Sequence, residues 1–158
     1  MRSSGRWSLE LIETEANGSE PSNRFETFEH EADIGIRGFG NTIEEAFENV
    51  ALALYSVMVN VNKVKQREKK SLVASAPNIE LLLVEWLNSL LSLSDVERIV
   101  FSKFEVAIEG LSLKGTAWGE SLDHVRHEPK VEVKGATYHM LSVKKKGGMY
   151  VAQCVVDV

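Results

Sequence analysis

The chain has 158 residues, a hydrophobic share of 44% and a formal net charge of −5, values typical of one soluble globular domain. Its single cysteine, Cys154, excludes an intrachain disulfide and a thiolate metal cluster, and the apolar sequence around it favours an inert core thiol. The negative charge argues against a free-standing nucleic-acid binder and a DNA partner, while the lack of a long apolar run or apolar leader predicts a cytoplasmic protein with no membrane partner.

The first 24 residues are polar and contain the turn-rich stretch NGSEPSN. They show no sustained hydrophobic periodicity, so we expect a flexible N-terminal segment outside the core. Residues 25–158 are therefore predicted to form the single domain.

Two apolar strand fragments open this domain and are separated by ionisable side chains. The first is FETF, at residues 25–28, and the second resumes at Ile34. Between them, in FEHEADIG, lie His30, Glu31 and Asp33, an imidazole and two carboxylates within four residues. A turn aspartate is the simplest interpretation of Asp33, whereas a binding site would need further ligands from elsewhere in the chain.

Two helices are predicted from caps and hydrophobic spacing. Residues 41–58 begin with a capping box of Thr42 and Glu45, and their apolar side chains follow at helical spacing along one stripe. Residues 76–95 place Asn78 at the N-cap. This second helix is apolar around most of its circumference, which predicts a central helix packed on more than one side.

Strands are predicted for most of the remaining sequence. One lies between the helices at residues 69–76, and a hairpin over residues 98–120 turns at Gly110. A second hairpin, over residues 137–158, turns at Gly147–Gly148, and its last strand is apolar on both faces, as expected of a central strand. The predicted fold class is α+β: a single compact domain with a mostly antiparallel or mixed sheet of about seven strands packed with two helices.

Basic residues concentrate in two stretches. Lys63–Lys70 (KVKQREKK) alternates basic side chains with a period of two, and Lys144–Lys146 precedes the Gly147–Gly148 turn. Solvent-facing strand positions and a hairpin tip account for both, because lysine at a sheet edge discourages edge-to-edge association. The alternative is a contact for RNA or for an acidic partner.

The sequence ends in VVDV, so an apolar strand finishes at Asp157 and the carboxylate of Val158. If the strand of Asp33 lies beside this one, three carboxylates converge. A hard divalent cation (Ca²⁺, Mg²⁺ or Mn²⁺) would then neutralise them. Spacing alone does not show that they meet, and a turn aspartate with a solvated terminus is the alternative.

Other chemistries have weaker support. His124 and His127 in DHVRHE are spaced like a ligand pair but lack a third ligand, so a polar helical turn is favoured. Gly35, Gly38 and Gly40 do not have the spacing of a phosphate-binding loop, and neither a nucleophile elbow nor an HExxH motif is present. A small metal-dependent hydrolase would lack a base and a nucleophile, so the chain is not predicted to be an enzyme.

The sequence resembles the archease family in four stretches that run in order through residues 25–158. The first, FEHEADIGIRGFGNTIEEAFENVALALYSVM, contains the His-x-Ala-Asp-Ile/Leu-Gly pattern and the Thr-x-x-Glu-Ala-Phe helix of the family. The others are LLLVEWLNSLL, VEVKGATYHML with its Lys-Ala/Gly-x-Thr-Tyr-His pattern, and the terminal VVDV. The extra N-terminal stretch, and Glu31 where many members carry threonine, depart from the pattern.

This resemblance implies a compact α+β fold of the SHS2 type and an accessory protein rather than an enzyme. Archeases assist the GTP-dependent, metal-dependent RNA ligase of tRNA splicing by promoting its guanylylation and multiple turnover. This ligase is therefore the expected partner, with tRNA contacted at most indirectly. A chaperone-like or RNA-binding module acting with tRNA-modifying enzymes is the alternative function.

The resemblance also implies a set of site residues. The metal-binding aspartates of the family correspond to Asp33 and Asp157, and the carboxylate of Val158 is the expected third ligand of a divalent ion (Ca²⁺, Mg²⁺ or Mn²⁺). Secondary candidates, which match the motifs or lie close to them in sequence, are His30, Glu31, Lys134 and His139.

Overall fold

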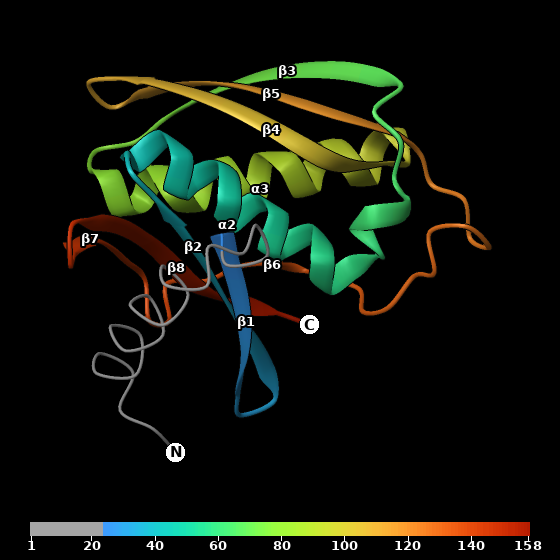
Figure 1. The fold of residues 1–158 in the computed structure, drawn as a ribbon, viewed down its shortest axis with the longest axis horizontal. Coiled ribbons are helices and arrows are strands. Elements are labelled where there is room, and N and C mark those ends of the chain that lie inside the picture. The colour runs from blue at the N-terminus through green and yellow to red at the C-terminus, as the bar shows by residue number, and fades with distance from the viewer. Residues whose placement is uncertain (1–23) are drawn as a thin grey trace.

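A computed structural model describes residues 24–158 of the chain (Figure 1). Two helices, α2 (Ile43–Met58) and α3 (Ile79–Glu97), lie between a three-stranded and a five-stranded sheet, both antiparallel. Within residues 24–158, the predicted α+β class with two helices is confirmed, and the eight strands divide between two sheets instead of forming one. Apart from Arg24, the predicted flexible segment lies outside the described residues.

The larger sheet is built around its last strand. Its members are β1 (Phe25–His30), β2 (Asp33–Gly40), β6 (Gly135–Ala136), β7 (Ser142–Lys146) and β8 (Met149–Asp157). β2 pairs along one edge of β8, while β6 and β7 share the other edge. The central position predicted for the terminal strand from its apolar character is therefore confirmed.

The predicted C-terminal hairpin begins later than expected. β7 starts at Ser142 and turns into β8 through Gly147 and Gly148, whose φ angles of 56° and 83° suit glycine. Residues 137–141 form a turn instead of a strand, closed by the Leu141 N–H, which donates to the Tyr138 carbonyl at 3.2 Å. Met140 has a φ of 54°, a conformation that is incompatible with a continuous strand.

The smaller sheet has the order β3-β5-β4 and includes the predicted hairpin at Gly110. Its strands are β3 (Glu68–Ser75), β4 (Ile99–Glu109) and β5 (Ser112–Ser121). The side of β5 that faces α3 packs closely, because a Cβ on Gly115 would lie 2.2 Å from the Trp86 ring. The opposite face of this sheet points away from the helices (Figure 1).

The basic stretch Lys63–Lys70 is a strand only from Glu68 onward. Residues Val61–Lys63 form a 3-10 turn, η2, and the following residues lie beside the end of β5. The Arg67 N–H donates to the Gly119 carbonyl at 3.0 Å. The strand predicted over residues 69–76 is therefore confirmed to within one residue as β3 (Glu68–Ser75), whereas the alternating basic residues before it are not part of a strand.

Local signals in the sequence explain both helices. The Thr42 hydroxyl accepts the Glu45 N–H at 3.0 Å at the start of α2, and the Asn78 side chain accepts the Leu81 N–H at 2.9 Å at the start of α3. The predicted central helix is confirmed, since its fully buried residues are Leu82, Leu83, Trp86, Leu87 and Leu90. Within residues 24–158, neither helix is long and apolar enough to cross a membrane.

Cys154 on β8 belongs to the same core. The thiol is fully buried, and burial raises its pKa to about 12. A thiol held in the neutral form is a poor nucleophile and metal ligand. The predicted inert core thiol is therefore confirmed.

Candidate functional site

The polar interruption FEHEADIG is a tight β-hairpin. His30 ends β1, Asp33 begins β2, and the two residues pair across the turn. Glu31 is exposed within the turn and has a φ of 56°, in the left-handed region that few non-glycine residues adopt. Because directly opposite residues share a face of a sheet, His30 and Asp33 lie on the same side of the hairpin.

Asp33 also lies beside the end of the chain. Ile34 pairs with Val156, so the next position along the antiparallel ladder sets Asp33 against Asp157. The Val158 N–H donates to Oδ1 of Asp33 at 3.4 Å. The fold therefore brings together the three residues for which the sequence predicts a shared carboxylate site.

Three secondary candidates approach this point from other segments. The ring centroids of His30 and His139 are 6.0 Å apart. The Lys134 N–H donates to the backbone carbonyl of Asp157 at 2.7 Å, and the Lys134 side chain is exposed. We call this group the terminal corner, and it consists of His30, Asp33, Lys134, His139, Asp157 and Val158.

The carboxylates of the terminal corner are hard oxygen ligands. Within residues 24–158, no three side chains of His, Cys, Asp or Glu form a ready-made ligand group. Asp33 and Asp157 could supply two side-chain ligands, and the carboxylate of Val158 could supply a third. Such a set fits Ca²⁺, Mg²⁺ or Mn²⁺, which accept carboxylate ligands together with water.

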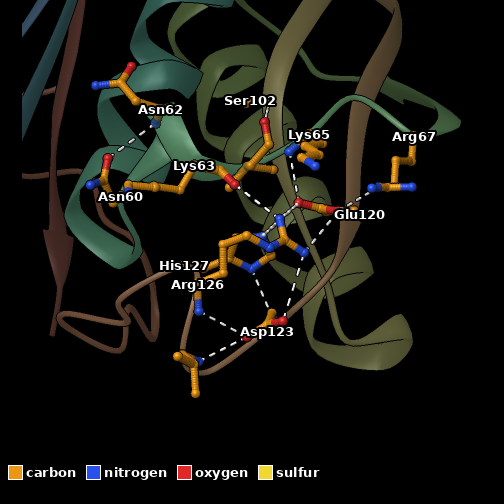
Figure 2. A network of polar contacts seen from close by, with 12 residues as sticks. Asn60, Asn62, Lys63, Lys65, Arg67, Ser102, Glu120, Asp123, Arg126 and His127 are labelled. Carbon is orange, nitrogen blue, oxygen red and sulfur yellow. Dashed lines mark hydrogen bonds and ion pairs between the residues drawn. The ribbon is translucent and has the colours of Figure 1, made fainter.

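A second polar cluster, which the sequence analysis missed, lies at the end of β5 (Figure 2). Glu120 is only 4% exposed, yet its carboxylate accepts the Lys65 N–H at 2.8 Å and the Arg67 Nε–H at 3.1 Å. The Arg126 guanidinium also donates to it, as does His127 through Nε2 at 2.8 Å. We call this the Glu120 cluster, and its members are Lys65, Arg67, Glu120, Asp123, Arg126 and His127.

These contacts keep Glu120 ionised. The Arg126 guanidinium is the main cause of the lowered pKa of the Glu120 carboxyl, and the Lys65 N–H and His127 act in the same direction against the opposing effect of burial. The cluster joins residues 65–67, β5 and the turn after it (Figure 2). It is therefore a satisfied structural network rather than a reactive site.

The two histidines of DHVRHE occupy different environments. His127 is fully buried and its Nδ1 accepts the Asp123 N–H at 2.8 Å, so Nε2 carries the proton that is donated to Glu120. His124 is exposed and lines a hollow of about 430 Å³ near the C-terminal ends of α2 and α3. The segment is a single polar helical turn, as predicted, because the His127 N–H donates to the Asp123 carbonyl at 2.9 Å. The histidine spacing therefore does not reflect a metal pair.

Comparison with known proteins identifies the family. Residues 25–158 match the Archease protein family (MTH1598/TM1083). Protein archease of Pyrococcus abyssi is 49% identical over 140 residues, which cover 85% of this chain and 99% of that protein. Protein archease of Sulfurisphaera tokodaii is 44% identical over 137 residues, with the same two coverages. The chain belongs to the archease family.

Solved structures share the fold of this archease. The solution structure of Methanobacterium thermoautotrophicum protein 1598 gives a TM-score of 0.76 at 36% identity and covers 85% of this chain and 99% of its own. A Thermotoga maritima crystal structure, described as an archease and possible chaperone, gives 0.59 at 22% identity with coverages of 84% and 96%. The second likeness concerns the fold alone.

Proposed function

We propose that this archease is a cytoplasmic accessory protein of the tRNA-splicing RNA ligase, promoting guanylylation and multiple turnover of the ligase, and is not itself an enzyme. The observation that carries the proposal is the position of Asp33 beside Asp157 and Val158 at adjoining strand ends. Membership of a family whose relatives are named archease supports an accessory role.

Asp33, Asp157 and the carboxylate of Val158 would hold a divalent ion, either Ca²⁺, Mg²⁺ or Mn²⁺. Without a cation these carboxylates repel one another. When bound, the ion supplies positive charge that can order the phosphates at the nucleotide centre of the ligase. Asp157 is exposed and Asp33 is half-buried at a hairpin turn, so a partner protein can approach them. The neighbouring histidines and Lys134 would contact the partner or the water around the ion.

Replacing either aspartate tests the proposal. Asp33→Ala and Asp157→Ala should each abolish multiple-turnover ligation while leaving single-turnover ligation by a pre-guanylylated ligase intact. Calorimetric titration of Ca²⁺ or Mn²⁺ should show a strong loss of affinity, because each variant lacks a charged oxygen ligand. The melting midpoint should stay unchanged or rise, since one of several repelling carboxylates is gone.

Glu29→Ala provides a matched control. Glu29 is an exposed carboxylate of β1 next to His30 in sequence, and strand alternation places it on the other face. This variant should bind metal and activate the ligase like the wild type. Normal metal binding and activation by both aspartate variants would refute the carboxylate site and favour the chaperone-like or RNA-binding alternative.

A further inference from the structure

The outward face of the three-stranded sheet carries a tryptophan between two lysines. Trp118 of β5 is half-buried and stands opposite Lys69 of β3 and Lys103 of β4 in the strand register. The Lys103 Nζ lies 4.6 Å from the centre of the indole ring. Both lysines are exposed, and the ion pairs within residues 24–158 use other cations.

Part of the outward surface beside this ring is open. Several of the outward positions near it have short side chains, at Ser71, Val73, Ala107 and Thr116. Val73 is 74% exposed, so nothing in residues 24–158 covers that part of the sheet. Lys114, opposite Val73, adds a third cation, while Glu105, opposite Thr116, is an acidic neighbour.

An aromatic ring between cations on an open sheet suits a single-stranded nucleic acid. A base stacks on the ring while the flanking lysines contact phosphates. An acidic peptide would use the lysines but would leave the indole without a role. Base stacking is worth more than an exposed lysine–aromatic contact, so a base can displace Lys103 from the ring and leave its ammonium group for a phosphate.

The basic stretch that the sequence analysis singled out contributes to this surface through one residue. Lys69 points outward beside Trp118, whereas Lys70 pairs with Glu97 at 2.7 Å and Arg67 pairs with Glu120 at 3.1 Å. The net charge of −5 restricts favourable phosphate contacts to such a local group of cations. Weak, salt-sensitive binding is therefore expected.

We propose that this surface, which we call the Trp118 face and define as Lys69, Lys103, Lys114 and Trp118, binds single-stranded RNA. One base stacks on the indole, and Lys69 and Lys103 contact phosphates on either side of it. The choice of RNA over DNA rests on the function proposed above, which brings this protein to an RNA ligase; the stacking and charge chemistry does not depend on that function.

Fluorescence anisotropy with a fluorescein-labelled oligouridylate of 12 nucleotides tests this proposal on the full chain without ligase. Two phosphate contacts predict that log K falls with log salt concentration with a slope of about −1.4. Trp118→Ala should weaken binding by about 5- to 150-fold, and Trp118→Phe by less because a stacking ring remains. Lys103→Ala should reduce the slope by about 0.7.

Lys145→Ala is the matched control. Lys145 lies 5.5 Å from the centre of the Tyr150 ring in the β7–β8 hairpin, so it repeats the lysine–aromatic contact on the other sheet. This variant should bind the oligouridylate like the wild type. The aspartate variants of the terminal corner should also bind it normally, and the Trp118 variants should bind metal normally, so each proposal can fail separately.

Three results would overturn the proposal. The first is no binding of the oligouridylate at low salt, and the second is binding that both Trp118 variants leave unchanged. The third is tighter binding of labelled oligothymidylate or of a labelled polyglutamate peptide. Tighter binding of the oligothymidylate would assign the Trp118 face to DNA, and tighter binding of the polyglutamate would assign it to an acidic protein segment.

Discussion

The terminal corner and the Glu120 cluster contain similar side chains in opposite surroundings. Each combines carboxylates with basic residues and histidine. Glu120 is buried and its carboxylate receives donors from four residues, whereas Asp157 is exposed and Asp33 accepts a long hydrogen bond of 3.4 Å. A buried charge has to be satisfied within the fold, while an exposed one keeps its bonding capacity for a ligand or partner.

The comparison predicts that Glu120→Ala will have the largest effect on stability. Its removal leaves Arg126 and His127 without their common acceptor, and the loss should be about 2–4 kcal/mol of unfolding free energy. This is somewhat below the range for a fully buried pair because the arginines are partly exposed. Urea denaturation would measure it. Glu105→Ala, which removes an exposed glutamate of β4, should change stability by less than about 0.5 kcal/mol.

Equal effects of Glu120→Ala and Asp157→Ala on stability would break the comparison. Asp157→Ala should leave the stability of the metal-free protein unchanged or raise it. The substitution removes the repulsion between neighbouring carboxylates and leaves no buried polar group without a hydrogen-bond partner. The two substitutions therefore separate a carboxylate that serves the fold from one that is free to serve binding.

A smaller loss is expected when His127 is replaced. His127→Leu leaves the Asp123 N–H without its acceptor and takes one donor from Glu120. Each unsatisfied buried group costs about 1–3 kcal/mol, and the partly exposed position of Asp123 places the expected loss near the lower end. His124→Leu, three residues earlier on the surface, should stay within about 0.5 kcal/mol. Similar losses from both variants would show that burial does not distinguish these histidines.

Sequence signals that act over a few residues located much of the fold. The caps at Thr42 and Asn78 and the apolar spacing after them fixed the two helices, and the uninterrupted apolar character of β8 fixed its central position. Residues 137–141 were assigned wrongly because the positive φ of Met140 has no signature in composition. A local backbone conformation of that kind depends on the surrounding fold.

Contacts between segments that are distant in the sequence could not be predicted from such local signals. Asp33 and Val158 are separated by 125 positions, and only the resemblance to archeases indicated that their strands adjoin. The Glu120 cluster had no such guide, because its members come from residues 65–67, from β5 and from the following turn. Its one visible signal was a glutamate near the end of a predicted strand with Arg126 and His127 shortly after it.

Acid should reduce stability through Glu120, and this is the smallest effect that the comparison predicts. The pKa of Glu120 in the folded protein lies below its ordinary value of 4.5, chiefly because of Arg126. The stabilising contribution is therefore complete above about pH 4.5 and is lost as the pH falls toward the folded pKa. Glu48 acts in the opposite direction, because burial raises its pKa.

The Glu120 contribution can be isolated by comparing wild type with Glu120→Gln in urea at about pH 6 and about pH 3. The stability difference between the two proteins should be smaller by about 1 kcal/mol at the lower pH. This change is modest because the arginines that pair with Glu120 are partly exposed to solvent, which screens the interaction. Glu48 titrates in both proteins. Asp123 also does, and its pKa is lowered by the backbone N–H groups of Arg126 and Val125. The contributions of these two residues therefore cancel in the stability difference. A difference that stays constant with pH would mean that the folded protein does not favour the ionised form of Glu120, and the Glu120 cluster would then owe its stability to packing rather than to charge.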